Sequence, residues 1–506
     1  MLSTLLSVES VPFDKPNMDY YALAPELILV GTIVVLALLD SIKLDRARAA
    51  MPAIAGLGFL AAIIPLVTLA VDGTTRVLLD GSYVVDSLSL VLKAMFIVSA
   101  YIVVLLSTNY MAEGDYWESE YYLLLVCSVL GMMVMASARD LISIFVALEL
   151  LSIPAYMLAA WRKRDLKSDE AGLKYYLMGV FASAIMLYGM SVIYGVTGTT
   201  LLADIAPRIG EEFSSQPIVT LGVVFVLIGF AFKVSAVPFH TWAPDTYEGA
   251  PTPVTAFLAV ASKAAGFVAL LSLIFVGFYG RSDVWEPLIW VLSALTMFVG
   301  NFIALRQTNV VRLLAYSGIA QAGYILAPLA VAGTDPEVAS QALHSVVIYL
   351  LIYAGMNLGA FAVVLAVARK TRSAEQDTFG GLFNYAPGLT VAMTLFLFSL
   401  AGIPPAAGWF AKLGIFQALA SAGTTSGYVL AVIVAVNSVI AFAYYGRLLR
   451  IMWMEEAPDG DTTPIRVPAS LTAALVITAA VTLVAGIAPG IVTHFTDPIQ
   501  LLALGG

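Results

Sequence analysis

Two lysines lie inside long apolar segments, next to prolines that interrupt those segments. Lys233 occurs in VVFVLIGFAFKVSAVPFHTW, five residues before Pro238, and Lys412 follows Pro404 and Pro405 in FSLAGIPPAAGWFAKLGIF. A charged side chain at the centre of a bilayer costs roughly 2.5–3.5 kcal/mol even on the lenient insertion scale. A proline removes a backbone donor and breaks the helix. A buried charge beside a broken helix is typical of membrane proteins that conduct ions.

A carboxylate lies in a third apolar segment, DLISIFVALELLSIPAYMLAAW, where Glu149 precedes Pro154 by five residues. A carboxylate at bilayer depth is costly unless it is neutral or paired. We predict that Glu149 titrates and is paired with Lys233, because burial and a nearby carboxylate shift the proton affinity of a lysine in opposite directions. A small motion of the pair would then load or unload a proton. The alternatives are a structural hydrogen bond from Glu149 to a neighbouring helix and a permanent ion pair.

A further lysine, Lys263, lies about ten residues into TPVTAFLAVASKAAGFVALL, among small side chains that leave room for water. A lysine in mid-helix cannot easily reach the membrane surface, so we predict that Lys263 is a proton relay. Lys412 is the expected terminal site of that path, since a broken helix frees carbonyls and amides that water can bind. Snorkelling of Lys412 to the surface is the alternative.

Three other residues are possible relay groups. His240 falls in the first break, and its unperturbed pKa near neutrality suits a relay between Lys233 and Lys263; a capping or packing role is the alternative. His344 is a weaker candidate in another apolar segment. Lys174, in GLKYYLMG near the start of its segment, more often snorkels or pairs in such a place.

The composition is that of a membrane protein without a redox centre. Of 506 residues, 60% are hydrophobic and 12% are charged, whereas soluble domains have about 25% charged residues. A single cysteine, Cys127, and three scattered histidines cannot hold an iron–sulfur cluster or several haems. No phosphate-binding loop, dinucleotide fingerprint or metal-ligand cluster occurs, and the basic residues form no nucleic-acid footprint. We therefore expect no metal and no cofactor on this chain.

Apolar runs long enough to span a bilayer recur along the whole chain. We predict an all-α integral membrane protein with about fourteen transmembrane helices, at 23–42, 50–71, 87–107, 121–137, 140–160, 173–196, 217–238, 253–278, 285–304, 312–332, 338–368, 388–421, 427–449 and 468–490.

The basic residues orient these helices. Fifteen lysines and arginines fall in the connectors of one side and five, Lys15 among them, fall on the other. By the positive-inside rule, both termini are external, which is periplasmic for a bacterial inner membrane. The acidic segment 111–120 falls on the predicted cytoplasmic side, and the rule does not account for it.

The two breaks indicate an internal repeat. Pro238 and Pro404 are 166 residues apart, and the same shift carries the start of the fourth helix to the start of the ninth. A unit of five helices inverts its orientation when it is copied, as in many transporters. We predict four parts with broken helices 7 and 12: N-terminal helices 1–3 in 1–120, a first repeat in 121–280, a second repeat in 281–450, and a loop with helix 14 in 451–506.

The longest motifs resemble a known family. PFHTWAPDTYEGAPTPVTAFLAVASKAAGF (238–267) resembles the signature of the antiporter-like membrane subunits of respiratory complex I, the proton-translocating NADH:quinone oxidoreductase, and looks most like the subunit N branch. EAGLKYYLMGVFASAIMLYG (170–189) and AGIPPAAGWFAKLGIF (401–416) look like the same branch. The resemblance covers essentially the whole chain.

This resemblance implies a fourteen-helix fold of two inverted halves that pumps protons, driven by quinone reduction in partner subunits. The family's key glutamate matches Glu149, and its key lysines match Lys233, Lys263 and Lys412; a glutamate replaces the last in the M-type subunit. The implied partners are the M-type subunit, the small K-, J- and A-type subunits and the lipid bilayer. NADH, FMN, quinone and iron–sulfur clusters would belong to partner subunits, so the chain would serve a translocase without turnover of its own.

Two other functions fit parts of the pattern. A subunit of a cation/proton antiporter would have the same ancestral fold and the same buried residues, and would differ in its driving force. A membrane scaffold without an ion path is the third reading, which the buried Glu/Lys set disfavours. The identity of the co-purifying subunits separates the first two readings.

Overall fold

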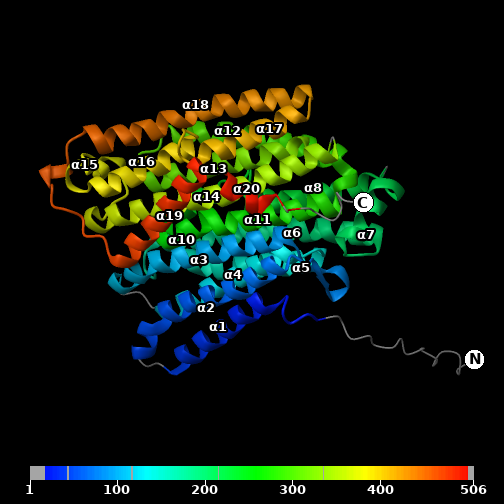
Figure 1. The fold of residues 1–506 in the computed structure, drawn as a ribbon, viewed down its shortest axis with the longest axis horizontal. Helices are drawn as coiled ribbons and strands as arrows, with labels where there is room; N and C mark the ends of the chain where they lie inside the picture. Colours follow the sequence, from blue (N-terminus) through cyan, green and yellow to red (C-terminus); the bar gives the residue numbers. More distant parts are fainter. Residues whose placement is uncertain are drawn as a thin grey trace, which may run out of the picture.

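The computed structural model describes residues 18–42, 45–114, 118–214, 216–333, 335–497 and 499. Long helices run side by side along the longest dimension of the molecule (Figure 1). The long helices are α1 (Ala24–Ile42), α2 (Asp45–Asp72), α3 (Ser87–Glu113), α4 (Glu118–Ser137), α5 (Leu141–Ala159), α6 (Leu166–Thr197), α8 (Pro217–Lys233), α12 (Ser282–Ala304), α13 (Val310–Leu326), α14 (Pro336–Thr371), α16 (Pro387–Ala401), α17 (Gly408–Ser421), α18 (Thr425–Met454) and α19 (Ala469–Ile487).

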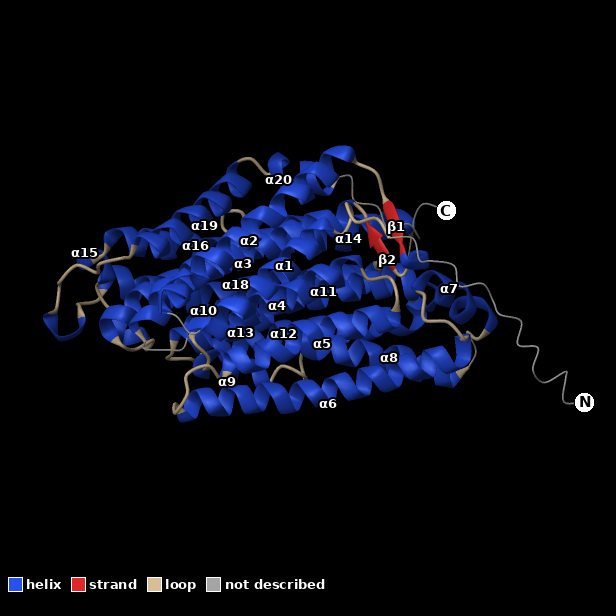
Figure 2. Ribbon diagram, turned by 90° about the horizontal axis from the view of Figure 1, so that it is seen from below, coloured by secondary structure: helices blue, strands red, loops and turns tan. Residues whose placement is uncertain are grey.

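Shorter elements connect or complete these helices. The helices α10 (Thr252–Phe257) and α11 (Lys263–Ser272) belong to one continuous helix, Thr252–Gly277, whose backbone widens to π-helical turns at Leu258–Ser262 and Leu273–Gly277. A small antiparallel hairpin lies at one end of the bundle (Figure 2). The remaining short elements are α7 (Leu202–Pro207), α9 (Trp242–Gly249), α15 (Leu382–Tyr385), α20 (Gly490–Thr496), β1 (Arg76–Leu78) and β2 (Tyr83–Val85).

Each of the fourteen predicted apolar segments is helical over most of its length. Twelve helices in the described residues are long and apolar enough to cross a membrane, and α8 and α16 are apolar but shorter. These two are the helices that precede the predicted breaks. The all-α membrane fold with two broken helices is therefore confirmed, while the number of fourteen spans stays a prediction.

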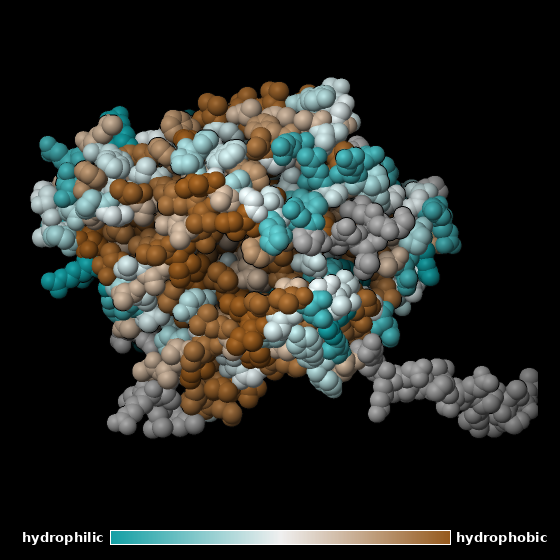
Figure 3. Space-filling view, in the orientation of Figure 1, coloured by the Kyte–Doolittle hydropathy of each residue, from teal (hydrophilic) through white to brown (hydrophobic). Residues whose placement is uncertain are grey.

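The outer surface fits a bilayer. Large apolar side chains face outward in mid-helix, with Leu57, Ile64 and Val439 exposed by 65%, 67% and 73%. Figure 3 shows brown, hydrophobic residues over the middle of the visible face and teal, hydrophilic residues towards its two ends. Such a belt lets lipid tails cover the middle while water solvates both ends.

The two breaks form where the backbone cannot continue a helix. The first helix, α8, ends at Lys233, and residues 234–241 are non-helical before α9 begins at Trp242. In the second break α16 ends at Ala401, and Gly402 adopts a φ of +88°, a conformation that glycine adopts without steric cost. A Cβ atom at Gly402 would lie 2.7 Å from Cδ of Lys412, so the missing side chain also makes room for the lysine.

The order of packed pairs is the same in both predicted repeats. In the first, α4 packs on α5, and α6 packs on α8 and α9; in the second, α12 packs on α13, and α14 packs on α16 and α17. A serine hydroxyl joins each leading pair: Ser128 donates to the Leu151 carbonyl at 2.7 Å, and Ser293 donates to that of Gly323 at 2.7 Å. The boundaries at residues 120, 280 and 450 stay a prediction.

One end of the bundle collects the basic connectors. Asn309 bridges to Glu375 there, Arg447 binds the Gln307 carbonyl, and Lys370 pairs with Asp461. We call this the basic end; it is the predicted cytoplasmic side. Glu113 belongs to the acidic segment 111–120, which the positive-inside rule does not explain. Its carboxylate accepts a hydrogen bond from Arg369 at 2.9 Å, so part of the negative charge of this segment is neutralised. Lys15, Lys43 and residues 1–17, 115–117 and 500–506 lie outside the described residues.

A buried ion pair fastens the first helix to the third. Lys93 Nζ lies 2.8 Å from Glu26 Oε1, and the two side chains are 0% and 8% exposed. The Tyr83 hydroxyl donates to the same carboxylate oxygen at 2.8 Å and accepts from Lys93 at 3.1 Å. Lys93 thus has a contacting carboxylate partner on α1.

This pair generates a stability prediction. Lys93→Met alone leaves the Glu26 carboxylate buried without its cation, which costs about 3–5 kcal/mol. We expect a lower thermal unfolding midpoint of the membrane-extracted chain and less of it in membranes. The double variant Glu26→Gln/Lys93→Met should recover most of the loss, because no charge is then stranded. A single variant as stable as the double would contradict the prediction.

Candidate functional site

The three predicted lysines are buried in the helix bundle. Lys233, Lys263 and Lys412 are exposed by 3%, 2% and 5%. None of them forms an ion pair within 4 Å among the described residues, in contrast to Lys93. Their hydrogen-bond partners in the described chain are hydroxyl groups and backbone carbonyls. These are neutral oxygens that do not fix the charge of the amine.

Lys233 is the last residue of α8, at the mouth of the first break. Its Nζ donates to Ser152 Oγ of α5 at 2.9 Å and to the Tyr175 hydroxyl of α6 at 3.2 Å. A Cβ atom at Gly266 would lie 3.0 Å from Lys233 Cγ, so the glycine lets α11 pass close behind the lysine. Sequence reasoning missed Ser152 and Tyr175, because a serine and a tyrosine in apolar helices are ordinary residues.

Glu149 lies near Lys233 without touching it. The carboxylate of Glu149 accepts a hydrogen bond from Ser183 Oγ at 2.6 Å, and it interacts with Lys233 through the longer-range Coulomb force. Ser152, the partner of Lys233, is three residues further along the same helix. Among the described residues Glu149 thus forms the hydrogen bond to a neighbouring helix that was the structural alternative, and no contact ion pair. Its pairing with Lys233 stays a prediction.

Lys263 lies in the continuous helix Thr252–Gly277, every residue of whose apolar window is buried. The π-helical turn Leu258–Ser262 directly precedes it; such turns often mark functional sites. Its Nζ donates to the Gly318 carbonyl of α13 at 2.6 Å.

Lys412 lies on α17, just after the second break. Its Nζ donates at 2.8 Å to the carbonyl of Ala401, the last residue of α16. The ammonium lies 4.8 Å from the centre of the Tyr324 ring. The break frees a carbonyl, as the sequence predicted, and this carbonyl binds the lysine. The role of Lys412 as terminal proton site stays a prediction. Snorkelling does not occur, since the side chain is buried.

Buried polar side chains lie beside both of these lysines. Ser317, next to the Gly318 that binds Lys263, shares a 2.5 Å hydrogen bond with the Tyr445 hydroxyl. Gln321 Nε2 donates to the carbonyl of Leu400, next to the Ala401 that binds Lys412, at 3.1 Å. Sequence analysis did not single out these residues; the one available signal was an amide in the apolar run YSGIAQAGYIL.

Among the described residues, no hydrogen bond joins the three possible relay groups to these lysines. His240, half-buried in the first break, has an Nδ1 atom without a hydrogen-bond partner in the described chain. His344 shares a 3.4 Å contact with Ser340 Oγ on its own helix. Lys174 pairs with Glu170 and Asp245, each at 2.6 Å, which is the paired role that the sequence left open. No hydrogen bond joins His240 to Lys233 or Lys263, so its relay role stays a prediction.

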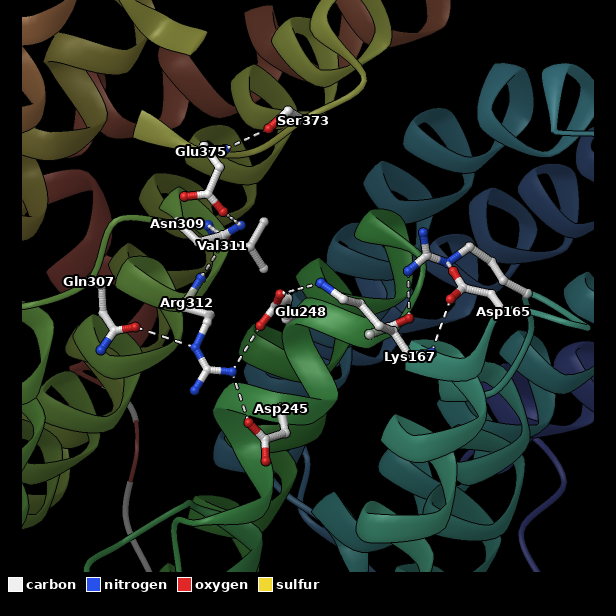
Figure 4. A network of polar contacts seen from close by, with 12 residues as sticks. Asp165, Lys167, Asp245, Glu248, Gln307, Asn309, Val311, Arg312, Ser373 and Glu375 are labelled. Atoms are coloured by element: carbon white, nitrogen blue, oxygen red, sulfur yellow. Dashed lines mark hydrogen bonds and ion pairs between the residues drawn. The ribbon is translucent and has the colours of Figure 1, made fainter. Parts of the chain in front are cut away.

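An ion-pair network holds the short helix α9 at the basic end (Figure 4). Asp245 of α9 lies 2.6 Å from Lys174 of α6 and 2.8 Å from Arg312 of α13. Glu248, one turn on, lies 2.9 Å from Lys167 of α6 and 2.9 Å from the same arginine. We call these five residues the α9 clamp. It ties the second half of the broken helix to the first repeat and to the second.

Comparisons with known proteins agree with this architecture. The family described as "NADH:quinone oxidoreductase/Mrp antiporter, TM" matches residues 138–441, a range that includes Glu149 and the three buried lysines. The chain belongs to this family. NADH-quinone oxidoreductase subunit N of Trichlorobacter lovleyi is 42% identical over 84% of this chain and 86% of its own length. NADH-quinone oxidoreductase subunit N 1 of Koribacter versatilis is 39% identical over 98% of both chains. The resemblance to the subunit N branch is thereby confirmed.

Solved structures show the same family fold. A chain of respiratory complex I from Thermus thermophilus superposes with a TM-score of 0.77 at 33% identity, over 92% of this chain and 98% of that one. A chain of the Mrp complex from Dietzia superposes with a TM-score of 0.82 at 20% identity, over 96% and 97% of the two chains; at that identity the likeness concerns the fold alone.

Within the described residues, no group of three or more histidine, cysteine, aspartate or glutamate side chains is arranged to hold a metal ion. Cys127 is a free thiol.

The α9 clamp generates a second prediction. Arg312→Gln leaves the Asp245 and Glu248 carboxylates without their shared cation, and we expect the free energy of unfolding to fall by about 1–2 kcal/mol, a value reduced for the partial exposure of the site. Low salt should enlarge the effect. The matched control is Arg450→Gln, because Arg450 lies 3.8 Å from Glu455 and is 72% exposed, so that pair contributes little. Equal losses in the two variants, measured by thermal unfolding, would show that the clamp adds nothing.

Proposed function

We propose that this chain translocates protons as an antiporter-like membrane subunit of an NADH:quinone oxidoreductase, and that Glu149, Lys233, Lys263 and Lys412 carry the protons. The observation that carries the proposal is the set of three buried lysines whose amines face neutral oxygens. A buried ammonium without a contacting carboxylate has lost water and gained no counter-ion, so its charge is easily given up. Lys93 supplies the contrast, since its contacting carboxylate holds the charge in place.

Glu149 is the group through which energy enters. When a unit charge arrives ~4 Å from an ionised carboxylate, the electrostatic energy of the carboxylate changes by about 4 kcal/mol at an effective dielectric constant near 20. That energy corresponds to roughly a thousandfold change in a proton-binding equilibrium. Because Glu149 acts on Lys233 across space, displacing Glu149 or neutralising it changes the attraction for the lysine's proton. Protons then pass to Lys263 and on to Lys412 for release.

The surface around Glu149 supports a partner subunit. Glu149 is only half-buried in this chain, and its helix α5 presents an apolar stripe of Ile142, Val146, Ile153 and Met157, each more than half exposed. Ionisable side chains within a membrane avoid lipid and face protein or water. A neighbouring membrane subunit that covers this stripe would bury the carboxylate and deliver the charge movement. The M-type subunit and the small K-, J- and A-type subunits are the proposed neighbours.

The proposed location is a bacterial inner membrane, with the basic end in the cytoplasm and both termini outside. NADH, FMN, quinone and iron–sulfur clusters are assigned to partner subunits. A cation/proton antiporter subunit is the second candidate, since the matched family includes Mrp antiporters. Relatives at 38–42% identity named as NADH- or NAD(P)H-quinone oxidoreductase subunits favour the first. Affinity purification that recovers antiporter subunits and no NADH-linked ones would reverse this choice.

The role of Lys263 yields a third prediction. Lys263→Ala removes the amine in mid-path, so we expect the complex to assemble while proton pumping and coupled quinone reductase activity fall at least tenfold. The assay is NADH-driven acidification of inverted or reconstituted vesicles. Lys163→Ala, at an exposed lysine of the basic end, is the control and should behave as wild type. Normal proton transfer by an assembled Lys263→Ala complex would overturn the assignment.

The role of Glu149 yields a fourth prediction. Glu149→Gln keeps the shape and hydrogen-bonding capacity of the side chain and removes its charge, so coupled activity should fall, while Glu149→Asp should retain more. Because the energy is carried by charge, neutral Glu149 should also reduce pumping by the neighbouring antiporter-like subunit. The measurement is the proton-to-electron ratio of the assembled complex. If turnover stays normal and only this subunit's share of protons is lost, the channels work independently.

A further inference from the structure

The side chain of Tyr247 is an unexplained buried polar group in the core. It belongs to α9, the helix held by the clamp, and is 1% exposed. Its hydroxyl has no hydrogen-bond partner among the described residues. A buried hydroxyl without a partner costs free energy, and such a group in a native fold needs an explanation.

Two tyrosines that interact with Tyr247 lie beside Lys233 and Lys263. It interacts electrostatically with the hydroxyls of Tyr353 and Tyr175. Tyr175 is the group that accepts a hydrogen bond from Lys233 at 3.2 Å. A Cβ atom placed on Gly318 would lie 3.0 Å from the Tyr353 hydroxyl and 3.3 Å from Lys263 Nζ. Tyr353 and Lys263 therefore border the same small space, and Tyr247 interacts with one tyrosine beside each lysine.

The helix α9 holds Tyr247 in this position from both directions. On one side, Trp242 stacks on Tyr175 with ring centres 4.4 Å apart, and its Nε1 donates to the carbonyl of Phe232 at 3.2 Å. On the other, Asp245 and Glu248 flank Tyr247 in the sequence and are fixed by the clamp (Figure 4). The hydroxyl is thus placed by rigid contacts, although it forms no hydrogen bond of its own in the described chain.

We propose that the Tyr247 hydroxyl passes the proton between Lys233 and Lys263, with the Tyr175 and Tyr353 hydroxyls on either side of it. This inference rests on the proposed function, and it names the group that carries the proton between the two lysines. The proton leaves Nζ of Lys233 and one proton arrives at Nζ of Lys263. Each hydroxyl accepts one proton and gives up its own, so no tyrosine changes its charge overall. Water bridges any step longer than one hydrogen bond.

Tyr247→Phe tests the proposal cleanly, because it removes only the hydroxyl. Since that hydroxyl has no hydrogen bond to lose in the described chain, the variant should fold and assemble at least as well as wild type. We expect proton pumping and coupled quinone reductase activity of the assembled complex to fall at least tenfold. The solvent deuterium isotope effect on the remaining turnover should rise, because proton transfer becomes limiting; a purely structural role would not change it.

Tyr121→Phe is the matched control. Tyr121 is also fully buried, but its hydroxyl shares a 2.9 Å hydrogen bond with Ser107, between α3 and α4 and outside the lysine path. This variant should lose some stability and keep its pumping and its isotope effect, the reverse of Tyr247→Phe. Full pumping by assembled Tyr247→Phe, or equal pumping losses in the two variants, would overturn the proposal.

Two further variants separate the possible failures. If Tyr247→Phe pumps normally and His240→Gln does not, the histidine is the carrier and the tyrosine proposal is wrong. If Lys263→Ala also pumps normally, the proposed function itself fails. If Lys263→Ala is defective and Tyr247→Phe is normal, the function stands and only the tyrosine step is lost.

Discussion

The rest of the structure depends on how three lysine amines are kept in a dry interior without a contacting carboxylate. Lys233, Lys263 and Lys412 bind only neutral oxygens of the described chain. A neutral acceptor satisfies one N–H of the amine and leaves the cost of desolvating the charge uncompensated. The charged and uncharged amines are thereby brought closer in energy. A contacting carboxylate, such as the one on Lys93, would separate them and trap the proton.

The helix breaks follow from this requirement. Two of the three amines lie at a break, and the carbonyl that holds Lys412 belongs to the residue at which α16 ends. An uninterrupted helix would use that carbonyl in its own ladder, so no oxygen would be available in the middle of the bilayer. At Lys263 the acceptor, Gly318, is a glycine, and the absent side chain lets Nζ reach the backbone.

The two halves are alike in geometry and different in charge. In the first, Ser183 of α6 donates a hydrogen bond to Glu149 of α5; in the second, Tyr349 of α14 donates one to Gln321 of α13. The donors are 166 residues apart, the same spacing as between Pro238 and Pro404. An amide thus occupies the place of the carboxylate, so an electrostatic signal can act on the first half and finds no equivalent charge in the second.

The features that could be predicted from the sequence are those that depend on composition and on neighbouring residues. Apolar runs predicted the helices, and the prolines predicted both breaks, because these effects act within a few residues. The lysines could be found because a charge in an apolar run is rare. Their partners could not: Ser152 and Tyr175 are 81 and 58 residues from Lys233, and no local signal marks them. Nor could the sequence show that Glu149 and Lys233 are not in contact, since residue types alone are equally compatible with a contact ion pair and with a separated pair.

In the proposed mechanism, the separation of Glu149 from Lys233 decides which of the two groups responds first to a charge outside the chain. A contact pair would respond to a distant charge as one neutral unit, because the field on its two members nearly cancels. In the separated arrangement, the half-buried Glu149 carboxylate lies on the helix with the apolar outer stripe, and Lys233 is buried and bound to Ser152. The carboxylate therefore responds to an outside charge before the lysine does. A charge arriving on the α5 face therefore weakens or strengthens the pull on Lys233 before anything deeper moves. In the proposed path the proton then passes inward by way of the tyrosine hydroxyls, while the clamp ties α9 to α6 and α13.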